Sequence, residues 1–442
     1  LFRGGYSLRP GATTADIGTM ERPDDYRDYY AITRQYCDSV ISSGTHSLNK
    51  DYMQVFIDES AYRVTNNDDP IFEIPFTQLV SGNIGYIHGP RSNESNAGGT
   101  TGVNQWGMAS SSVRLNAFYR FTFDPQDARR AMVGFWGYEA DGTPTLENDR
   151  NNYCNKWSKF WDPDHTLGYM SEGSTGINFP YMRYADVLLM YAEAENELNN
   201  GPTAAARDAL KEVRRRAFRN ADNQGEMVDV YVDQASSKED FFDLLVDERA
   251  WEFGGENIRW KDLIRWNLYN QVVYTTFWRY YGVGSDDYSY DLYDEYDSYP
   301  RNIYYHVIPN PGDGSFPNTV LDVIEFFTDE EYGVDCQWAP IPIDYQLNHA
   351  DRLPSITGSD AWSQAEWFRW IDEDTGIARA DCRCSLRGYI YIDQQGSLFP
   401  SDMPWYSLET DLNSLPPVRY ILPIPSDAIS RSNGTYVNYY GY

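Results

Sequence analysis

The fold is decided by residues 184–198, which read YADVLLMYAEAENEL and are followed by NNGP at 199–202. Apolar side chains recur in this stretch three or four residues apart, at Tyr184, Val187, Leu188, Tyr191 and Leu198. That spacing places them on one face of an α-helix. The Asn-Asn-Gly-Pro run supplies the residue types at which helices end. We therefore predict an amphipathic helix that begins near Tyr181 and stops before Gly201.

A second helix is predicted directly behind the first, over about 203–218. Its small and apolar side chains are again three or four residues apart, at Ala206, Ala209, Leu210, Val213 and Ala217. Since only a few residues separate the two helices, we expect them to form an antiparallel hairpin. In the first helix, Ala192 and Ala194 are small enough to let a neighbouring helix approach closely.

Further helices are predicted on both sides of this hairpin. Residues 25–43 form one of them, and a single face of it carries Tyr29, Ile32, Tyr36 and Val40. Another begins at a capping box of Ser236 and Glu239, and a further helix follows it to Trp266. Successive hairpins of this size predict a mainly α fold, a tetratricopeptide-like helical-repeat scaffold with long irregular insertions. The scaffold segments are 25–43, 181–218 and 236–266.

The rest of the chain is expected to be loop-rich. Residues 45–180 contain one predicted strand, at 71–76, and residues 267–416 are rich in Tyr, Asp, Pro and Gly. Both regions are expected to face a ligand or a partner. Residues 417–442 are expected to pack on the scaffold. No linker-like segment interrupts the helices, so we predict that the whole chain forms one unit.

The composition excludes some classes of function. The 442 residues include 66 Asp and Glu against 36 Lys and Arg, a net charge of −30. Such a charge repels phosphate backbones, so no nucleic-acid partner is expected. The sequence also lacks an apolar run of about 20 residues, the length that spans a membrane. With 37 Tyr and 13 Trp, the chain has many aromatic faces. They suit the stacking of sugar rings, or the packing of irregular segments onto a core.

Residues that could perform catalysis or bind metal are not arranged in familiar motifs. The sequence has no nucleophile elbow, no zinc-protease motif and no phosphate-binding loop, so we expect no enzyme. The five cysteines form no CxxC pair and no zinc site. Asp286, Asp287 and Asp291 supply oxygen ligands that calcium would accept, but they lack the ordered spacing of an EF-hand, which favours a solvated acidic loop over a calcium site. No other cofactor is expected.

Acidic and basic residues alternate through 248–266 among apolar and aromatic ones. Arginine makes forked hydrogen bonds to carboxylates, which suits a partly buried ion-pair network. We predict a structural ion-pair cluster that holds two helices together, formed by Arg249, Glu252, Glu256, Arg259 and Asp262.

Three segments together resemble one family. Residues 183–194 read RYADVLLMYAEA, residues 248–266 read ERAWEFGGENIRWKDLIRW, and residues 420–425 read YILPIP, with a terminal Gly-Tyr. In this order, over most of the chain, they resemble the SusD/RagB-like family of outer-membrane nutrient-binding lipoproteins. Asn257 stands where the family commonly has Gly; Asn tolerates a positive φ better than most residues.

The resemblance implies a substrate-binding lipoprotein at the cell surface of Bacteroidota, anchored by lipid in the outer membrane. It would capture oligosaccharides and deliver them to a SusC-like TonB-dependent barrel. Two alternatives stay open, which are oligopeptide capture for a RagA-like transporter and a structural subunit of a surface complex. The family also implies a lipidated segment before Leu1, which this chain would lack.

Members of the family generally build the ligand surface from loops that leave the scaffold. Two loops here carry aromatic residues beside amides or acids, and their candidate ligand-binding residues are Asn104, Gln105, Trp106, Trp278, Tyr280 and Tyr281. A ring would stack on a sugar while amides or carboxylates fix its hydroxyls. Docking on the barrel, or packing into the core, are equally weighted alternatives for these loops.

Overall fold

The computed structural model of this chain describes most residues up to 276 and selected segments beyond. The described residues are 1–63, 67–92, 108–115, 119–120, 122–124, 126–134, 136–138, 144–146, 152–161, 174–276, 302–309, 319–324, 363–366, 411–415, 417 and 420–442. No helix in these ranges is both long enough and apolar enough to cross a membrane.

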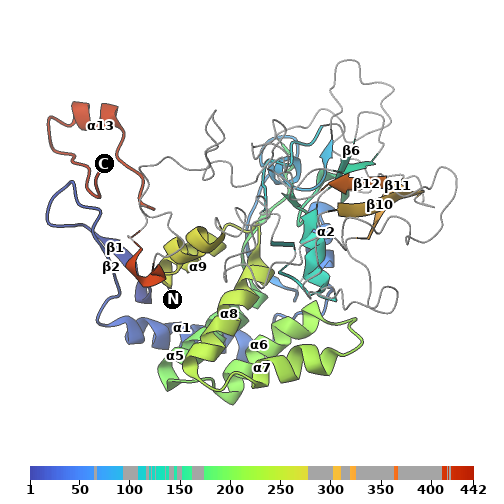
Figure 1. The fold of residues 1–442 in the computed structure, drawn as a ribbon, viewed down its shortest axis with the longest axis horizontal. Coiled ribbons are helices and arrows are strands. Elements are labelled where there is room, and N and C mark those ends of the chain that lie inside the picture. The colour runs from blue at the N-terminus through green and yellow to red at the C-terminus, as the bar shows by residue number, and fades with distance from the viewer. Residues whose placement is uncertain are drawn as a thin grey trace, which may run out of the picture.

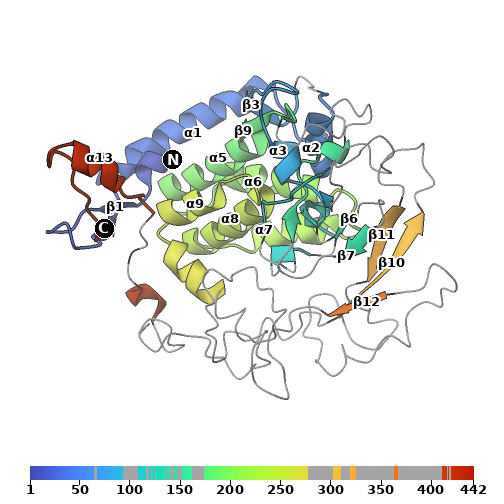
Figure 2. The ribbon, with the colours of Figure 1, turned by 90° about the horizontal axis from the view of Figure 1, so that it is seen from above.

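The chain is mainly helical, as predicted, and its scaffold helices lie close to their expected bounds. They are α1 (Tyr26–Ser43), α5 (Tyr184–Asn199), α6 (Ala204–Ala217), α8 (Lys238–Phe253) and α9 (Arg259–Arg265). Helix α5 is central, because it contacts α1, α6 and α8. Figure 2 shows α1 along one edge of this group, with α5 beside it.

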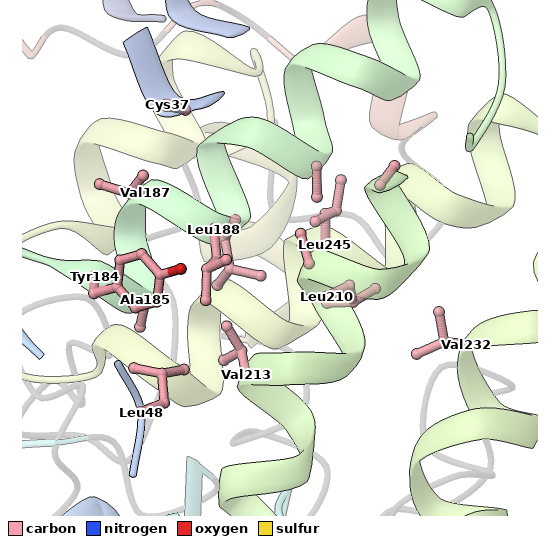
Figure 3. Close-up of a cluster of buried hydrophobic side chains, with 14 of the residues drawn as sticks. Cys37, Leu48, Tyr184, Ala185, Val187, Leu188, Leu210, Val213, Val232 and Leu245 are labelled. Atoms are coloured by element: carbon pink, nitrogen blue, oxygen red, sulfur yellow. The ribbon is translucent and has the colours of Figure 1, made fainter. Parts of the chain in front are cut away.

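The largest hydrophobic core lies between these helices (Figure 3). Helix α5 contributes buried residues from all around its surface, including Ala185, Leu189 and Ala192, each fully buried. When a helix is buried on every side, each of its side chains has to be apolar or to have a polar partner. Leu210 and Val213 of α6 and Leu245 of α8 enter the same cluster.

The turn between α5 and α6 follows the sequence rules. Asn200 ends α5 in the left-handed conformation, with φ at 55°, which Asn tolerates better than most residues. The side chain of Thr203 then accepts a hydrogen bond from the amide of Ala206 at 3.1 Å and caps α6. The two helices contact each other along their length, as a hairpin requires.

The capping box of α8 is shifted by one residue from its predicted position. Ser237, not Ser236, is the N-cap, and its partner is Asp240, not Glu239. Ser237 has the extended backbone that an N-cap needs, and the Asp240 amide donates to its hydroxyl at 3.0 Å. The sequence has an acidic residue three positions after each serine, so the pattern alone did not separate them.

Helix α1 turns only part of the face that the sequence emphasised to the scaffold, because Val40 packs against the core but two other residues do not. Ile32 and Tyr36 are exposed by 50% and 68%, whereas Tyr30 and Cys37 are buried. Tyr30 donates a hydrogen bond to Glu193 of α5 at 2.9 Å, and this contact fixes the rotation of α1. The two faces have equivalent apolar spacing, so burial is decided by the partner helix.

The expected loop-rich region 45–180 contains more regular structure than predicted. Helix α2 (Tyr52–Ser60) was not predicted. The predicted strand is β3 (Pro70–Ile74), and it pairs antiparallel with β9 (Phe179–Arg183), which leads directly into α5. Helix α3 (Ile84–Ile87) lies in the same region, to one side of the scaffold in Figure 2.

This region has a hydrophobic core of its own. Its buried members are Tyr52, Phe56, Ile84, Phe123, Met132, Val133, Trp157 and Ile177. Trp157 is fully buried, and its ring meets that of Phe56 edge-on with centroids 5.3 Å apart. The described residues between 45 and 180 therefore form a second packed layer.

The remaining elements are short. They are η1 (Phe2–Gly4), β1 (Ser7–Arg9), β2 (Thr19–Glu21), β4 (Arg91–Ser92), η2 (Ala128–Met132), β5 (Val133–Gly134), β6 (Trp136–Tyr138), β7 (Pro144–Leu146), β8 (Tyr153–Cys154), η4 (Lys159–Trp161), the π-helical η5 (Glu226–Val230), α7 (Tyr231–Asp233), β10 (Asn302–Pro309), β11 (Thr319–Ile324), β12 (Ser363–Glu366), η9 (Leu412–Ser414) and α13 (Ser426–Arg431). The last three strands form an antiparallel sheet in the order β11-β10-β12.

The C-terminal segment lies beside the N-terminal hairpin of β1 and β2. The Leu8 amide donates to the hydroxyl of Tyr420 at 2.8 Å, and the Gly441 amide donates to the carbonyl of Thr14 at 2.9 Å. Figure 1 shows α13 and this hairpin at the same end of the molecule. The hairpin segment reaches the scaffold through the Tyr6 amide, which donates to the carbonyl of Arg265 at 2.7 Å.

Candidate functional site

The ligand and metal candidates from the sequence fall outside the described residues. These are Asn104, Gln105, Trp106, Trp278, Tyr280, Tyr281, Asp286, Asp287 and Asp291. Within the described ranges, no three His, Cys, Asp or Glu side chains are grouped so that they could hold a metal ion. What the structure does place is the pair of residues that flank the Trp106 segment, and the predicted charged cluster.

The ends of the loop that carries Trp106 are joined to each other. Ser92 and Ala109 form an antiparallel bridge, with the Ser92 amide donating to the Ala109 carbonyl at 3.1 Å and the reverse bond at 3.3 Å. Both residues are buried, at 1% exposure each. The Ser110 amide adds a bond to the carbonyl of Tyr86 at 2.9 Å. The residues that flank the Trp106 segment are therefore buried and hydrogen-bonded to each other.

Part of the predicted ion-pair cluster lies between α5, α8 and α9. Arg249 forms ion pairs with Asp262 and Asp186, both at 2.7 Å. Arg265 pairs with Asp262 at 2.8 Å and with Glu193 at 2.5 Å. All five residues are buried. We call these five residues the second network. It joins α5 to α8 and α9.

Glu252 and Glu256 belong to a larger set, which we call the central network. It contains five carboxylates and five cations, all buried, linked by ion pairs into one connected group. Its members are Asp69, Asp127, Arg129, Lys156, Arg183, Arg214, Arg216, Glu248, Glu252 and Glu256. Five negative and five positive charges balance, which is what burial of so many ions demands.

Arg183 connects most of the central network. Its guanidinium pairs with Glu252 at 2.9 Å, with Glu256 at 2.7 Å and with Asp69 at 2.5 Å. Arg183 is the last residue of β9 and the N-cap of α5. Asp69 also caps α5, because its Oδ1 accepts from the amide of Ala185 at 3.0 Å. One arginine thus joins the second core to the helical scaffold.

The other cations come from separate elements. Arg129 of η2 pairs with Asp127 at 2.7 Å and with Glu248 at 2.6 Å. Arg214 of α6 also forms an ion pair with Glu248, at 2.8 Å. Lys156, just after β8, pairs with Glu256. Helix α8 therefore presents Glu248 and Glu252, which lie one turn apart, to cations from the region before residue 180 and from α6.

Arg259 behaves differently from the other four predicted cluster residues. Its Nη1 donates to the backbone carbonyl of Val246 in the middle of α8, at 2.7 Å. Burial lowers the pKa of this guanidinium from its ordinary value. Its contact still holds α9 against α8, but through the backbone.

The charges in both networks are mutually stabilised. Burial alone would raise the pKa of Asp69, but the guanidinium groups of Arg183 and Arg216 bring it below its ordinary value. Burial is likewise outweighed at Glu256 by Arg183 and Lys156, and the pKa of this carboxyl is lowered. Nearby opposite charges favour the ionised form. Asp69 and Glu256 therefore favour their charged forms, and the ion pairs of both networks hold elements together.

None of the five cations of the central network was predicted from the sequence. The signal was present in α6, where Arg214 follows Leu210 by four residues and so lies on the apolar face of an amphipathic helix. An arginine there needs a buried carboxylate. Arg129, Lys156 and Arg183 gave no comparable signal, because each lies in a short element or a connection.

A buried carboxyl lies outside these networks, beside Trp157. Glu59 accepts a hydrogen bond from the indole Nε1 of Trp157 at 2.7 Å, and its Oε1 has no partner among the described residues. Burial raises the pKa of Glu59 well above its ordinary value. His88 packs edge-on against the same indole, with centroids 5.0 Å apart, and burial lowers its pKa to about 4. Both groups favour their neutral forms.

These features define a class of protein: a helical-repeat scaffold that buried ion pairs join to a second packed layer. The model of the SusD family matches residues 122–344, about half of the chain. The chain belongs to the SusD family.

Two curated relatives come from Formosa agariphila. The SusD-like protein P25 is 28% identical over 275 residues, covering 55% of this chain and 48% of the relative. The SusD-like protein P2 is 25% identical over 247 residues, covering 51% and 44%. The chain thus spans about half the length of the curated relatives that it matches.

Solved structures are similar over a comparable share. A SusD homologue from Bacteroides thetaiotaomicron covers 58% of this chain and 51% of its own, with 26% identity and a TM-score of 0.49. Surface glycan-binding protein A from the same species, in complex with laminarihexaose, covers 56% and 52%, with 19% identity and a TM-score of 0.39.

Proposed function

We propose that this protein captures oligosaccharides at the cell surface and delivers them to a SusC-like TonB-dependent barrel in the outer membrane. The observation that carries the proposal is the family match over residues 122–344. The family is one of nutrient-binding proteins, and an aromatic content of 16% suits a binder of sugar rings. The protein would bind its ligand without altering it, and so would not be an enzyme.

The arrangement of the described residues supports a rigid ligand surface. The loop that carries Trp106 leaves from and returns to the bridged pair Ser92 and Ala109. The layer beneath it is fixed to the scaffold by Lys156 and Arg183 of the central network. A binding loop whose base is fixed loses less entropy on binding, which favours affinity.

We propose Trp106, with Asn104 and Gln105, as one stacking site, and Trp278, with Tyr280 and Tyr281, as the other. The indoles would stack on pyranose rings, and the amides would bond to hydroxyls. Calcium, if bound, would be held by Asp286, Asp287 and Asp291. The protein would be anchored in the outer membrane by a lipid.

The test is calorimetric titration of the chain with a panel of neutral and acidic hexasaccharides and a panel of hexapeptides. Binding to one or more oligosaccharides, weakened about tenfold or more by Trp106→Ala or Trp278→Ala, is the expected result, because tenfold corresponds to about 1.4 kcal/mol. Binding to peptides alone would replace the proposal with oligopeptide capture. Binding to neither, with a stable partner complex, would favour a structural subunit.

Delivery to a barrel is tested separately. The protein, expressed in its native outer membrane and solubilised in mild detergent, should co-purify with a TonB-dependent barrel. Isolation of the protein alone, under conditions that preserve other outer-membrane complexes, would contradict the transport part of the proposal while leaving glycan capture intact.

A further inference from the structure

Trp260 is exposed where the other tryptophans with described side chains are not. Its exposure is 41%, against 0% for Trp157 and 8% for Trp266. It belongs to neither of the two main hydrophobic cores, whereas Trp251 packs against the second. Its indole is therefore an aromatic surface that solvent and a ligand can reach.

The ring of Trp260 is held in one orientation. Its Nε1 donates to the side-chain Oδ1 of Asn257, three residues earlier, at 2.8 Å. Asn257 has φ at 59°, a left-handed turn that precedes α9 and brings its amide back over the helix start. Helix α9, which follows the turn, is held by Asp262, which pairs with Arg249 and Arg265 in the second network. The indole is therefore presented by a rigid base and has its own N–H already satisfied.

Polar groups flank the ring. The Nδ2 of Asn257 belongs to the same amide whose oxygen accepts from the indole, and it is a hydrogen-bond donor next to the ring edge. The ammonium of Lys261 lies over the ring, 5.8 Å from its centroid. An aromatic face with an amide and an ammonium beside it matches a ligand that has one apolar face and hydroxyls around its rim. A pyranose ring has that chemistry.

We infer that Trp260, with Asn257 and Lys261, forms a further sugar-stacking subsite on the helical scaffold itself, separate from the loops that carry Trp106 and Trp278. The inference rests on the proposed glycan capture and adds a binding site on the scaffold. The indole provides the floor, and the amide and the ammonium bond to the hydroxyls of a neutral pyranose. The net charge of −30 disfavours an anionic sugar in this position.

The experiment compares four proteins by calorimetry with laminarihexaose, cellohexaose, xylohexaose and mannohexaose. They are the unmodified chain, Trp260→Ala, Asn257→Gly and the control Tyr36→Ala. Tyr36 is an exposed aromatic residue of α1 with an exposure of 68%. Asn257→Gly frees the indole while keeping the positive φ without strain. Thermal unfolding followed by circular dichroism shows that each variant is folded, and Trp260→Phe, which keeps a ring, replaces Trp260→Ala if that variant unfolds.

The inference predicts about tenfold weaker binding for Trp260→Ala, a smaller loss for Asn257→Gly and no change for Tyr36→Ala. Binding that is equal in the unmodified chain and in Trp260→Ala would overturn the subsite and leave glycan capture standing. An unmodified chain that binds none of the four hexasaccharides, nor any oligosaccharide of the wider panel, would overturn both.

Discussion

Arg183 and Glu252 form a buried ion pair, Nη1 to Oε1 at 2.9 Å, between residues 69 positions apart in the sequence. Arg183 is where β9 becomes α5, and Glu252 lies in the last turn of α8. The pair therefore joins the layer built from residues before 180 to the helical scaffold. Because both ends are buried, the contact depends on charge balance across the whole central network.

Removal of the Arg183 side chain should lower the free energy of unfolding. Arg183→Ala leaves Asp69, Glu252 and Glu256 buried with one cation fewer, and breaking a buried pair costs about 3–5 kcal/mol of the free energy of unfolding. Urea unfolding monitored by fluorescence measures the loss. Arg219→Ala is the matched control, because the Arg219–Asp51 pair is 34% and 66% exposed and such surface pairs contribute about 0–1 kcal/mol. Equal losses in the two variants would show that the network is not what joins the layers.

Glu59 should make stability depend on pH. Its pKa is raised by burial in the folded chain, so the folded state holds this proton more tightly than the unfolded state does. The contribution of Glu59 is most favourable below the unfolded pKa, about 4.3, and is lost as pH rises towards the folded pKa. Glu59→Gln removes this loss. The variant should therefore gain stability relative to the unmodified chain by about 1.4 kcal/mol for each pH unit within that window.

Urea midpoints at successive pH values from 4 to 8 measure the difference between the two proteins. Glu239→Gln, on the exposed first turn of α8, is the control and should run parallel to the unmodified chain. A Glu59→Gln difference that stays constant with pH would mean that Glu59 is ionised in the folded chain.

Gly255 should not tolerate a side chain. It has φ at 78°, and a Cβ at this position would collide with the Sγ of Cys154. Gly255→Ala should lower the free energy of unfolding by about 2 kcal/mol or more, since strain and overpacking add. Gly44→Ala is the control, with φ at 62° and no atom within 4 Å of the added Cβ. If the two alanines cost the same, contact with Cys154 contributes nothing.

The shifted capping box gives a residue-level check. Ser237→Ala should destabilise the chain by about 1 kcal/mol, because it removes the N-cap acceptor of α8. Ser236→Ala, one position earlier, should change stability by less than about 0.5 kcal/mol. Thermal unfolding of the two variants distinguishes them, and the reverse order would restore the position expected from the sequence.

The scaffold was predictable because its helices carry strong periodic patterns. Helices α5 and α6 repeat apolar residues over several turns and are bounded by Asn200 and Thr203. Helix α2 was missed although Tyr52, Val55 and Phe56 have helical spacing. Its last three residues, from Asp58, are polar yet buried, and they interrupt the pattern. Burial of polar residues depends on tertiary partners that the sequence does not reveal.

The charged cluster was predictable only in part. Arg249 and Asp262 lie 13 residues apart on consecutive helices, so their contact follows from local alternation of charge. The partners of Glu252 come from Arg129, Arg183 and Arg216, which belong to elements far apart in the sequence. Pairing over such separations is set by how the two layers pack. The alternation of charge within one segment does not reveal which distant residues will pair.

The central claim is that this protein binds carbohydrate, and affinity electrophoresis of the unmodified chain tests it most directly. The chain is run through native gels cast with laminarin, xylan or mannan, beside gels without polysaccharide and a non-binding marker protein. The account predicts that at least one polysaccharide retards the chain relative to the marker. Mobility that is unchanged in every gel, together with measurable binding of hexapeptides, would contradict it.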